Sequence, residues 1–391
     1  MITENGGSLQ TLRRTNQARL LSLLIEHAPV HRAKLARLAG VSRTTVSTII
    51  GELVERGLVV ETVAPAAAHD GRAREFLTVA PDAGAAAGLD FTLDRIWGHL
   101  TDMSGRQIAS LGAQVPAGSP WTERLDAGLE LLDRLLAESG RDRSDLIGVG
   151  IGVPGPIDRS TGVVGASLPG QAWAGVNVAK EFGSRVAAAV VVENNTRLEA
   201  VTEIMSGAGR GARDVFYFGL SSGIGTGLFL DGKLYRGAVG AAGELGHVSV
   251  NIDGPACPCG NRGCLVQYAA VPAVLAALRE HLGPDCTVDD VLAAAAAGDR
   301  ACTGVLADVG TVVGRVLANL CNLLNPERIV VGGELSRAGD VLLEPIRTAI
   351  RRYALTVARD ADVVAAELDL GARAGAIGAA TLVLAETPQL A

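Results

Sequence analysis

The segment Arg32–Ile50 constrains the fold of this chain more than any other stretch. Apolar residues recur at helical spacing on both sides of Gly40. Glycine adopts a left-handed backbone at little cost, so Gly40 predicts a tight turn between two helices. Ser42 is a favourable N-cap for the second helix, and a further helical pattern covers Leu12–Glu26 and stops before Pro29. The residues spaced to close a small core between the two helices are Leu35, Val41, Val46 and Ile49.

This spacing is typical of a helix-turn-helix, in which the start of the second helix meets base edges in the major groove. Arginine can read guanine or bind phosphate, and hydroxyl groups can do either. The acidic residues Glu52 and Glu55 come only later on this helix, so we predict a DNA-contacting surface; a solvated polar helix face is the alternative. The residues predicted to contact DNA are Arg43, Thr44, Thr45, Ser47 and Thr48.

Two strand patterns follow, Leu58–Val63 and Glu75–Val79, on either side of a Gly-Arg-x-Arg sequence. They predict the wing of a winged helix, whose Arg72 and Arg74 suit a minor groove or phosphates; an ordinary exposed hairpin is the alternative. Residues 1–80 hold ten Lys/Arg and seven Asp/Glu, a net of +3, whereas the remaining residues hold 25 and 35, a net of −10. This asymmetry favours a nucleic-acid-facing head on an acidic body.

From Pro81 onward, short β patterns and glycine-rich turns alternate with alanine-rich helices, which predicts an α/β body of two lobes. No uncharged apolar stretch of about 18 residues occurs, and the N-terminus has no apolar leader core, so we expect a cytoplasmic protein without a membrane span. The strand patterns cover 87–92, 96–101, 147–153, 190–193, 215–220 and 328–333, and the helical ones 121–136 and 311–324.

The run Gly150–Gly155 fits the G-x-G-x-x-G pattern of a dinucleotide-binding loop. That loop must open directly into a helix. Here Pro154 and Pro156 flank the last glycine, and Asp158–Gly162 has the composition of a turn. We therefore predict no nicotinamide cofactor.

A compact group of metal-ligand residues lies in the second half of the chain, with the spacing His-x9-Cys-x-Cys-x4-Cys. Three thiolates and an imidazole suit a tetrahedral zinc ion, and four protein ligands leave no open position, so we predict a structural zinc site. Free thiols or a redox pair are the alternatives. The ligands are His247, Cys257, Cys259 and Cys264; we expect Cys286, Cys302 and Cys321 to be small buried apolar residues.

Together these segments resemble the ROK family (repressors, open reading frames and sugar kinases), over residues from about 10 to 385. The resemblance implies a two-lobed, actin-like (ribonuclease H-like) sugar-kinase fold with a sugar pocket in its cleft. A helix-turn-helix ahead of such a body resembles the repressor branch, which regulates xylose, glucose or N-acetylglucosamine genes. The segments that carry the resemblance are Gly148–Asp158, Val192–Thr196, Leu220–Gly237, Gly240–His247, Cys257–Cys264 and Asn325–Gly333.

Two kinase features of the family are missing. The family's phosphate loop, of type Asp-x-Gly-Gly-Thr, is replaced by Asp90-Phe-Thr-Leu-Asp94, without the glycines that let a backbone approach phosphate. The family's general-base aspartate is replaced by Asn195, and an amide cannot accept that proton. We therefore predict a transcriptional regulator, as a repressor, without phosphotransfer; an ATP-dependent sugar kinase with an added DNA-binding domain is the alternative. The glycine loop Gly223–Gly227 is kept.

The resemblance also implies an effector site for a sugar or sugar phosphate. One further sugar-binding glutamate of the family is Val266 here, and a usual asparagine is Ser167, which favours a different or less polar sugar; loss of effector binding is the alternative. The residues at family sugar-binding positions are Asn194, Asn195, Glu244 and His247, the last shared with zinc. The expected domains are 1–80, 81–193 completed by about 373–391, and 194–372 with the zinc loop and a dimerisation surface. On a palindromic operator we expect a homodimer, or a tetramer.

Overall fold

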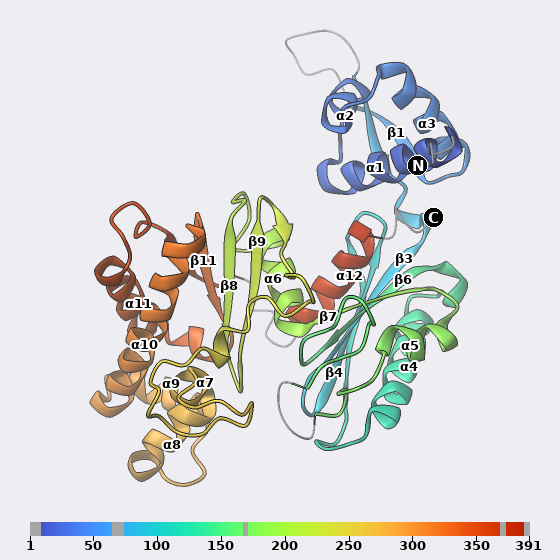
Figure 1. Cartoon of the computed structure of the whole chain (residues 1–391). Helices are drawn as coiled ribbons and strands as arrows, with labels where there is room; N and C mark the ends of the chain where they lie inside the picture. The colour runs from blue at the N-terminus through green and yellow to red at the C-terminus, as the bar shows by residue number, and fades with distance from the viewer. Residues whose placement is uncertain (1–8, 65–73, 167–170, 368–372, 387–391) are drawn as a thin grey trace, which may run out of the picture. The chain divides into compact units, whose positions relative to one another are not determined.

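Two five-stranded sheets with the same plan form the body of the protein, in a computed structural model that describes residues 9–64, 74–166, 171–367 and 373–386 (Figure 1). The strand orders are β5-β4-β3-β6-β7 and β10-β9-β8-β11-β12. In each sheet three consecutive strands form an antiparallel meander, and a helical crossover then returns the chain parallel to the first of them. This repeated α/β plan confirms the two-lobed, actin-like fold.

The chain divides into two compact units. The first comprises 1–152, 179–192 and 379–391, and includes the N-terminal head; the second comprises 153–178 and 193–378. The head contains α1 (Leu9–His27), α2 (Arg32–Ala39), α3 (Arg43–Glu55), β1 (Val59–Ala64) and β2 (Arg74–Val79). The rest of the first unit contains β3 (Ala85–Phe91), β4 (Arg95–Asp102), β5 (Gln107–Gln114), α4 (Trp121–Glu138), β6 (Leu146–Val153), α5 (Val178–Val186) and β7 (Ala189–Asn194).

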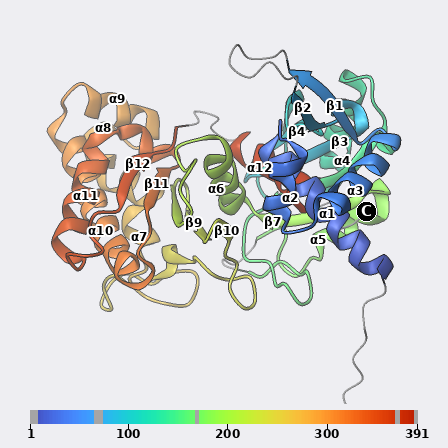
Figure 2. The same cartoon turned by 90° about the horizontal axis from the view of Figure 1, so that it is seen from above.

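The head is a winged helix-turn-helix, as predicted (Figure 2). Gly40 ends α2 with φ +63°, the left-handed conformation that its position in the turn requires. The Ser42 hydroxyl accepts a hydrogen bond from the Thr45 backbone N–H at 3.0 Å and so caps α3. Strands β1 and β2 pair antiparallel, and a bridge from Val30 to Leu77 adds a third short strand. The side chains that close the core include the fully buried Leu35 and Val46 and the nearly buried Ile49.

Gly150 has a packing role that explains part of the G-x-G-x-x-G pattern. A Cβ atom at this position of β6 would lie 2.2 Å from the carbonyl oxygen of Ala379 in α12 (Ala374–Glu386), so only glycine lets the helix cross there. After Gly155 the chain forms a turn and an isolated bridge between Ile157 and Val164, not a helix. The pattern therefore does not build a dinucleotide-binding loop.

Helices cover both faces of the sheet of the second unit. Helix α6 lies against β9, and α10 lies against α11 (Figures 1 and 2). Its elements are α6 (Asn195–Ser206), β8 (Val215–Leu220), β9 (Ile224–Leu230), β10 (Lys233–Leu234), α7 (Val266–Ala269), α8 (Val271–Leu282), α9 (Val288–Ala296), α10 (Arg300–Leu324), β11 (Arg328–Gly332), α11 (Asp340–Tyr353) and β12 (Asp362–Ala365).

Helix α10 is the one helix of the described residues that is long and apolar enough to cross a membrane, by length and composition alone. Half of its apolar window is buried inside the protein. A Cβ atom at Gly310 would lie 2.4 Å from the Leu342 carbonyl oxygen of α11, so the two helices cross at close range. The burial of Val313 and Leu317 in the same apolar core identifies α10 as a core helix of this unit.

Candidate DNA-binding surface, metal cluster and effector site

The first turns of α3 present an exposed, non-acidic surface. The side chains of Arg43, Thr44, Ser47 and Thr48 are exposed, and no ion pair of Arg43 is found within the described part of the chain. Thr45 is half-buried, and its hydroxyl lies 2.8 Å from the Ser42 hydroxyl, so it belongs to the helix cap as well. The arrangement leaves four side chains free to reach a groove.

The strands of the wing are anchored to the start of α2. Arg32 forms ion pairs with Glu61 of β1 and, at 3.0 Å, with Glu75 of β2. The His31 Nδ1 atom lies 3.1 Å from the Glu75 carbonyl oxygen. The tip between the strands, with Arg72, lies outside the described residues, as does the side chain of Arg74, whose backbone begins β2.

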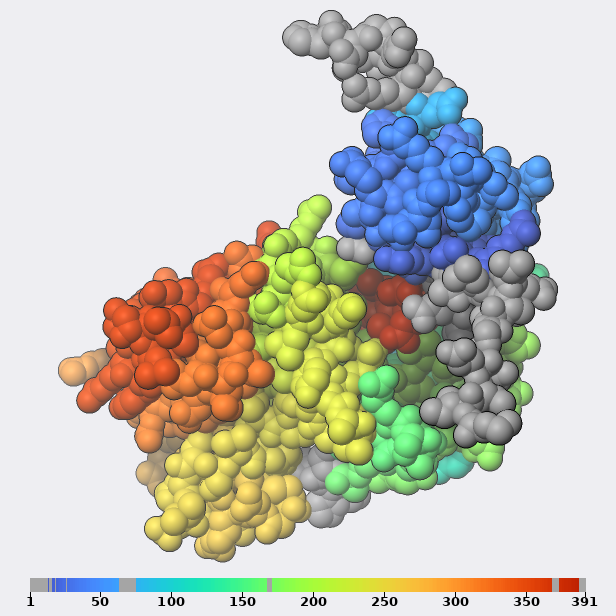
Figure 3. Space-filling model, turned by 45° about the horizontal axis from the view of Figure 1, so that its top comes forward, coloured from blue at the N-terminus to red at the C-terminus, as the bar shows by residue number. Residues whose placement is uncertain are grey.

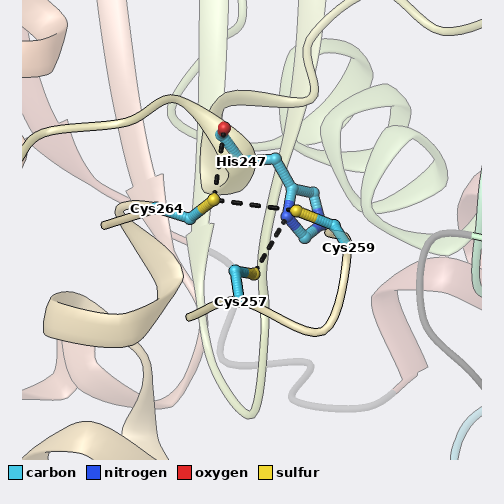
Figure 4. Close-up of side chains that lie close together, drawn as sticks. All are labelled: His247, Cys257, Cys259 and Cys264. Atoms are coloured by element: carbon cyan, nitrogen blue, oxygen red, sulfur yellow. Dashed lines mark hydrogen bonds between the residues drawn. The ribbon is translucent and has the colours of Figure 1, made fainter. Parts of the chain in front are cut away.

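His247, Cys257, Cys259 and Cys264 converge as the spacing predicted (Figure 4). Their ligand atoms all lie within 4.8 Å of one another. Cys257 Sγ lies 3.7 Å from His247 Nδ1, and Cys259 Sγ lies 3.7 Å from Cys264 Sγ. Zinc bonds of about 2.0–2.3 Å at tetrahedral angles would separate such ligand atoms by about 3.5–3.8 Å, so the four residues fit a zinc ion.

The loop that carries the cysteines folds tightly around this group and reaches the surface of the second unit, yellow in Figure 3. Gly263 has φ +61°, and a Cβ atom there would lie 1.7 Å from the Asn251 carbonyl oxygen, so the turn requires glycine. Bridges join Ser249 to Cys264 and Ala256 to Arg262. These contacts hold the four ligand residues close together.

Hydrogen bonding and burial act differently on the thiols. Burial works against ionisation of Cys257, but hydrogen bonds from the Cys259 backbone and from the Cys259 and His247 side chains lower its pKa to about 7. Burial, together with hydrogen bonds to the other two thiols, raises the pKa of Cys264 to about 12. Gln267, which the sequence did not single out, places its amide nitrogen 3.7 Å from Cys257 Sγ. An outer contact of this kind orients a ligand.

Two of the four residues predicted at the effector site, Asn194 and Asn195, lie at the start of α6. Asn194 caps this helix, because its Oδ1 accepts a hydrogen bond from the Arg197 backbone N–H at 3.3 Å, and its Nδ2 donates to the Gly155 carbonyl oxygen at 3.2 Å. Asn195 is the first residue of the helix. Both asparagines are half-buried, so their amides are held by the fold and still accessible.

Arg197 joins this helix start to the loop that carries Glu244. Its guanidinium donates to the Gly240 and Ala242 carbonyl oxygens at 2.8 and 2.7 Å, and pairs with Glu193 at 3.2 Å. Arg236 pairs with the other oxygen of Glu193 at 2.5 Å. The side chains of Arg197 and Glu193 are each 3% exposed, so the ion pair is a buried one. No pattern in the sequence pointed to this network.

Glu244 begins the short turn that ends at His247. Burial raises the pKa of Glu244, while the charges of Arg197 and His247 act in the opposite direction. The Glu244 carboxyl group is therefore close enough to Arg197 of α6 and to His247 of the metal cluster to interact with both. Val266 is half-buried in the first position of α7, and Ser167 lies outside the described residues.

Residues 90–94, which were expected to replace the family's phosphate loop, form a tight hairpin between β3 and β4. The Thr92 backbone N–H donates to the Arg95 carbonyl oxygen at 2.9 Å. The buried Arg124 donates to the carbonyl oxygens of Thr92 and Leu93 at 3.0 and 2.6 Å. The hairpin thus offers carbonyl oxygens to a guanidinium, whereas a phosphate loop offers N–H groups to an anion.

Two glycines of the run Gly223–Gly227 are explained by packing. A Cβ atom at Gly225 would lie 2.2 Å from Thr196 Oγ1, and one at Gly227 would lie 2.3 Å from Ala200 Cβ. Both contacts come from α6, which crosses β9 at this point. These glycines therefore need no nucleotide to account for them.

The pattern that defines the ROK family matches residues 87–386. This chain belongs to the ROK family. The head matches the pattern of the MarR family over residues 11–73. Among solved structures, a ROK family transcriptional regulator, a homolog of the E. coli MLC protein, aligns over 97% of this chain and 98% of its own, with TM-score 0.83 and 24% identity. That likeness confirms the fold, head and body together.

Curated relatives of this ROK chain include the xylose repressor of Bacillus spizizenii, 29% identical over 87% of both chains. The DNA-binding transcriptional repressor Mlc of Escherichia coli is 28% identical over 91% of this chain and 90% of its own. A glucokinase of Halalkalibacterium halodurans is 35% identical, but over 65% of this chain and 81% of its own. The two repressors thus match nearly the whole chain, and the kinase matches a smaller part of it.

Proposed function

We propose that this ROK protein is a DNA-binding transcriptional repressor of carbohydrate genes, whose body senses a sugar without phosphorylating it. The single observation that carries the proposal is the exposed, non-acidic start of α3 in a capped helix-turn-helix, on a body whose general-base position is Asn195. Relatives named as a xylose repressor and as Mlc, each similar over most of the chain, support it.

Arg43, Thr44, Ser47 and Thr48 are the side chains we assign to the major groove, with Thr45 contributing from the helix cap. Arg72 and Arg74 of the wing are assigned to phosphates or the minor groove. A palindromic operator read by two such heads calls for a homodimer, or a tetramer built from two. The protein acts in the cytoplasm, where operator DNA is found.

The effector is a sugar or sugar phosphate bound by Asn194, Asn195, Glu244 and His247. A carboxylate such as Glu244 can accept hydrogen bonds from two neighbouring hydroxyls. Val266 brings an apolar side chain where the family's sugar-binding glutamate would stand, which favours a ligand with one polar contact fewer.

Two features that do not depend on each other argue against phosphotransfer. Asn195 has no basic atom to take a proton from a sugar hydroxyl. The β3–β4 hairpin turns its carbonyl oxygens to Arg124, so it cannot cradle a phosphate by backbone N–H groups. The alternative of a sugar kinase with an added head therefore lacks both its base and its phosphate loop.

The metal in the His247 cluster is zinc in a structural role. Its four ligands would be His247 Nδ1 and the thiolates of Cys257, Cys259 and Cys264, with no position left for water. Bound zinc would hold the cysteine loop against the turn that carries Glu244. His247 would keep its Nε2 atom for the effector, so one side chain serves both sites.

The test is a mobility-shift titration of the full chain on the DNA upstream of its own gene, with ADP release measured across a sugar panel. We expect a sequence-specific complex that weakens steeply with salt, and no sugar-dependent ADP release. Arg43→Ala should weaken binding by about 1–3 kcal/mol, whereas the exposed body variant Arg359→Ala should not. Binding that ignores sequence, or sustained hexose-dependent ADP release, would contradict the proposal.

A further inference from the structure

A second group of metal-ligating side chains lies apart from the His247 cluster, where α8, α9 and α10 pack together. His281 stands in the last turn of α8, Asp299 caps α10, and Cys302 lies in the first turn of α10. One ligand atom from each of the three lies within 4.8 Å of the other two. Asp299 and Cys302 are three residues apart, but His281 lies 18 residues before Asp299 on another helix, so the sequence alone does not group the three.

The Asp299 carboxylate is fixed by two different contacts. Its Oδ1 accepts a hydrogen bond from the Cys302 backbone N–H at 2.9 Å and caps the helix. Its Oδ2 lies 2.8 Å from His281 Nε2. The cap therefore orients the carboxylate and leaves Oδ2 as the atom that faces the imidazole.

The Cys302 thiol also interacts with the Asp299 carboxylate, and burial together with this contact raises the pKa of the thiol. Cys302 is fully buried, whereas the His281 side chain is 46% exposed and that of Asp299 is 30% exposed. A soft sulfur thus lies at the bottom of the group, and an imidazole and a carboxylate lie at its rim. Cys286, in the loop between α8 and α9, is close enough to Cys302 for their charges to interact, which adds a second sulfur nearby.

Imidazole, carboxylate and thiolate are the donor types that zinc and cobalt bind in proteins. A tetrahedral ion would separate such atoms by about 3.3–3.8 Å, so the pair at 2.8 Å must open by about half an ångström. A rim that is exposed to solvent gives the ion a path of entry and a water molecule for its remaining position. The burial expected of Cys302 from the sequence is correct, but burial as an apolar residue does not account for its two neighbours.

We propose that His281, Asp299 and Cys302 form a second metal site that binds a divalent ion of the zinc type. The ion would join the last turn of α8 to the first turn of α10, two helices that are otherwise connected here through the Asp299 contacts. This site shares no ligand with the His247 cluster, so the two proposals stand or fall separately.

Cobalt(II) is the probe, because thiolate coordination gives it charge-transfer and visible absorption bands. The full chain is stripped with a chelator and titrated with Co²⁺, and zinc is counted in the purified protein. The wild type should bind one equivalent more than His281→Gln or Cys302→Ser, and these variants should lose affinity for that equivalent by at least about 100-fold. Cys259→Ser should keep the equivalent and give the weaker charge-transfer band of a site with a single thiolate.

Cys321→Ser is the matched control, because it makes the same substitution on the same helix outside both clusters. It should bind as much Co²⁺ as the wild type. Cys302→Ser alters a buried residue and could unfold the protein. In that case the comparison of the wild type with His281→Gln, whose side chain is exposed, tests the site. Equal Co²⁺ stoichiometry in the wild type and in a folded His281→Gln would overturn the proposal.

Discussion

Arg197→Met tests whether the buried ion-pair network positions the effector loop. Methionine keeps much of the volume but removes two charge-assisted hydrogen bonds to Gly240 and Ala242 and the ion pair with Glu193. Charged hydrogen bonds contribute about 1.5–3 kcal/mol each. Loosening of the loop would let water bind the freed carbonyl oxygens, which recovers part of this loss. Glu193 keeps Arg236 as a partner, so the loss comes mainly from the two hydrogen bonds, and we expect the free energy of unfolding of the second unit to fall by about 3–5 kcal/mol.

The assay is urea unfolding followed by the emission of Trp173, the buried tryptophan of the second unit, with Trp97 and Trp121 replaced by Phe. Arg213→Met is the control, since its pair with Asp231 lies in the same unit, is exposed and should contribute at most about 1 kcal/mol. Arg197→Met should also weaken sugar binding, because the loop that carries Glu244 loses its contact with Arg197. A loss in Arg197→Met no larger than in the control would refute the reasoning.

Three further predictions follow from particular contacts. Burial lowers the pKa of His99 from 6.5 to about 4. Between these pH values the unfolded chain binds a proton that the folded chain does not, so the free energy of unfolding should fall by up to about 3 kcal/mol as the pH drops from 6.5 to 4. Urea titrations at several pH values measure this, and His99→Gln should remove the pH dependence. Gly225→Ala should cost about 1–3 kcal/mol and weaken effector binding, because its Cβ would meet Thr196, whereas Gly223→Ala, with open space around it, should be neutral in thermal unfolding and ligand titration. Cys257→Ser should release the metal of the His247 cluster and lower the melting temperature; unchanged zinc content by elemental analysis would argue against that site.

The head could be predicted closely because its signals are local. Gly40 and Ser42 fix the turn and the cap through their own backbone and side chain, and the structure has both as expected. The first helix stops at His27, as Pro29 indicated. Local chemistry also gave the metal cluster, since three of its four ligands lie within one short loop.

Elements defined by distant contacts were predicted less well. Strand β5 was not predicted, because Gln107–Gln114 is largely exposed on one side and has weak apolar alternation. Helix α10 begins at Arg300, well before the predicted start at Thr311, because its first turns are set by the Asp299 cap. The glycines of Gly223–Gly227 looked like a loop, yet most of this run enters β9 and faces α6.

The same distinction explains what was missed at the sites. Arg197 lies next to the asparagines in the sequence, but its partners Gly240 and Ala242 are brought to it only by the fold. His281 lies on α8, and only the packing of α8 against α10 brings it to Asp299 and Cys302. Sequence patterns identify ligands that one loop supplies, and the structure is needed for those that several elements supply.

The most direct test measures whether a ligand that binds this protein changes its affinity for operator DNA. A thermal-shift screen of sugars and sugar phosphates first identifies a ligand, since a compound that binds only the folded state raises the melting temperature. Fluorescence anisotropy then measures operator affinity with and without it, for the wild type and for Glu244→Gln. We predict that the ligand changes operator affinity at least about fivefold in the wild type and not in Glu244→Gln. An operator affinity that the identified ligand leaves unchanged in the wild type would contradict the account.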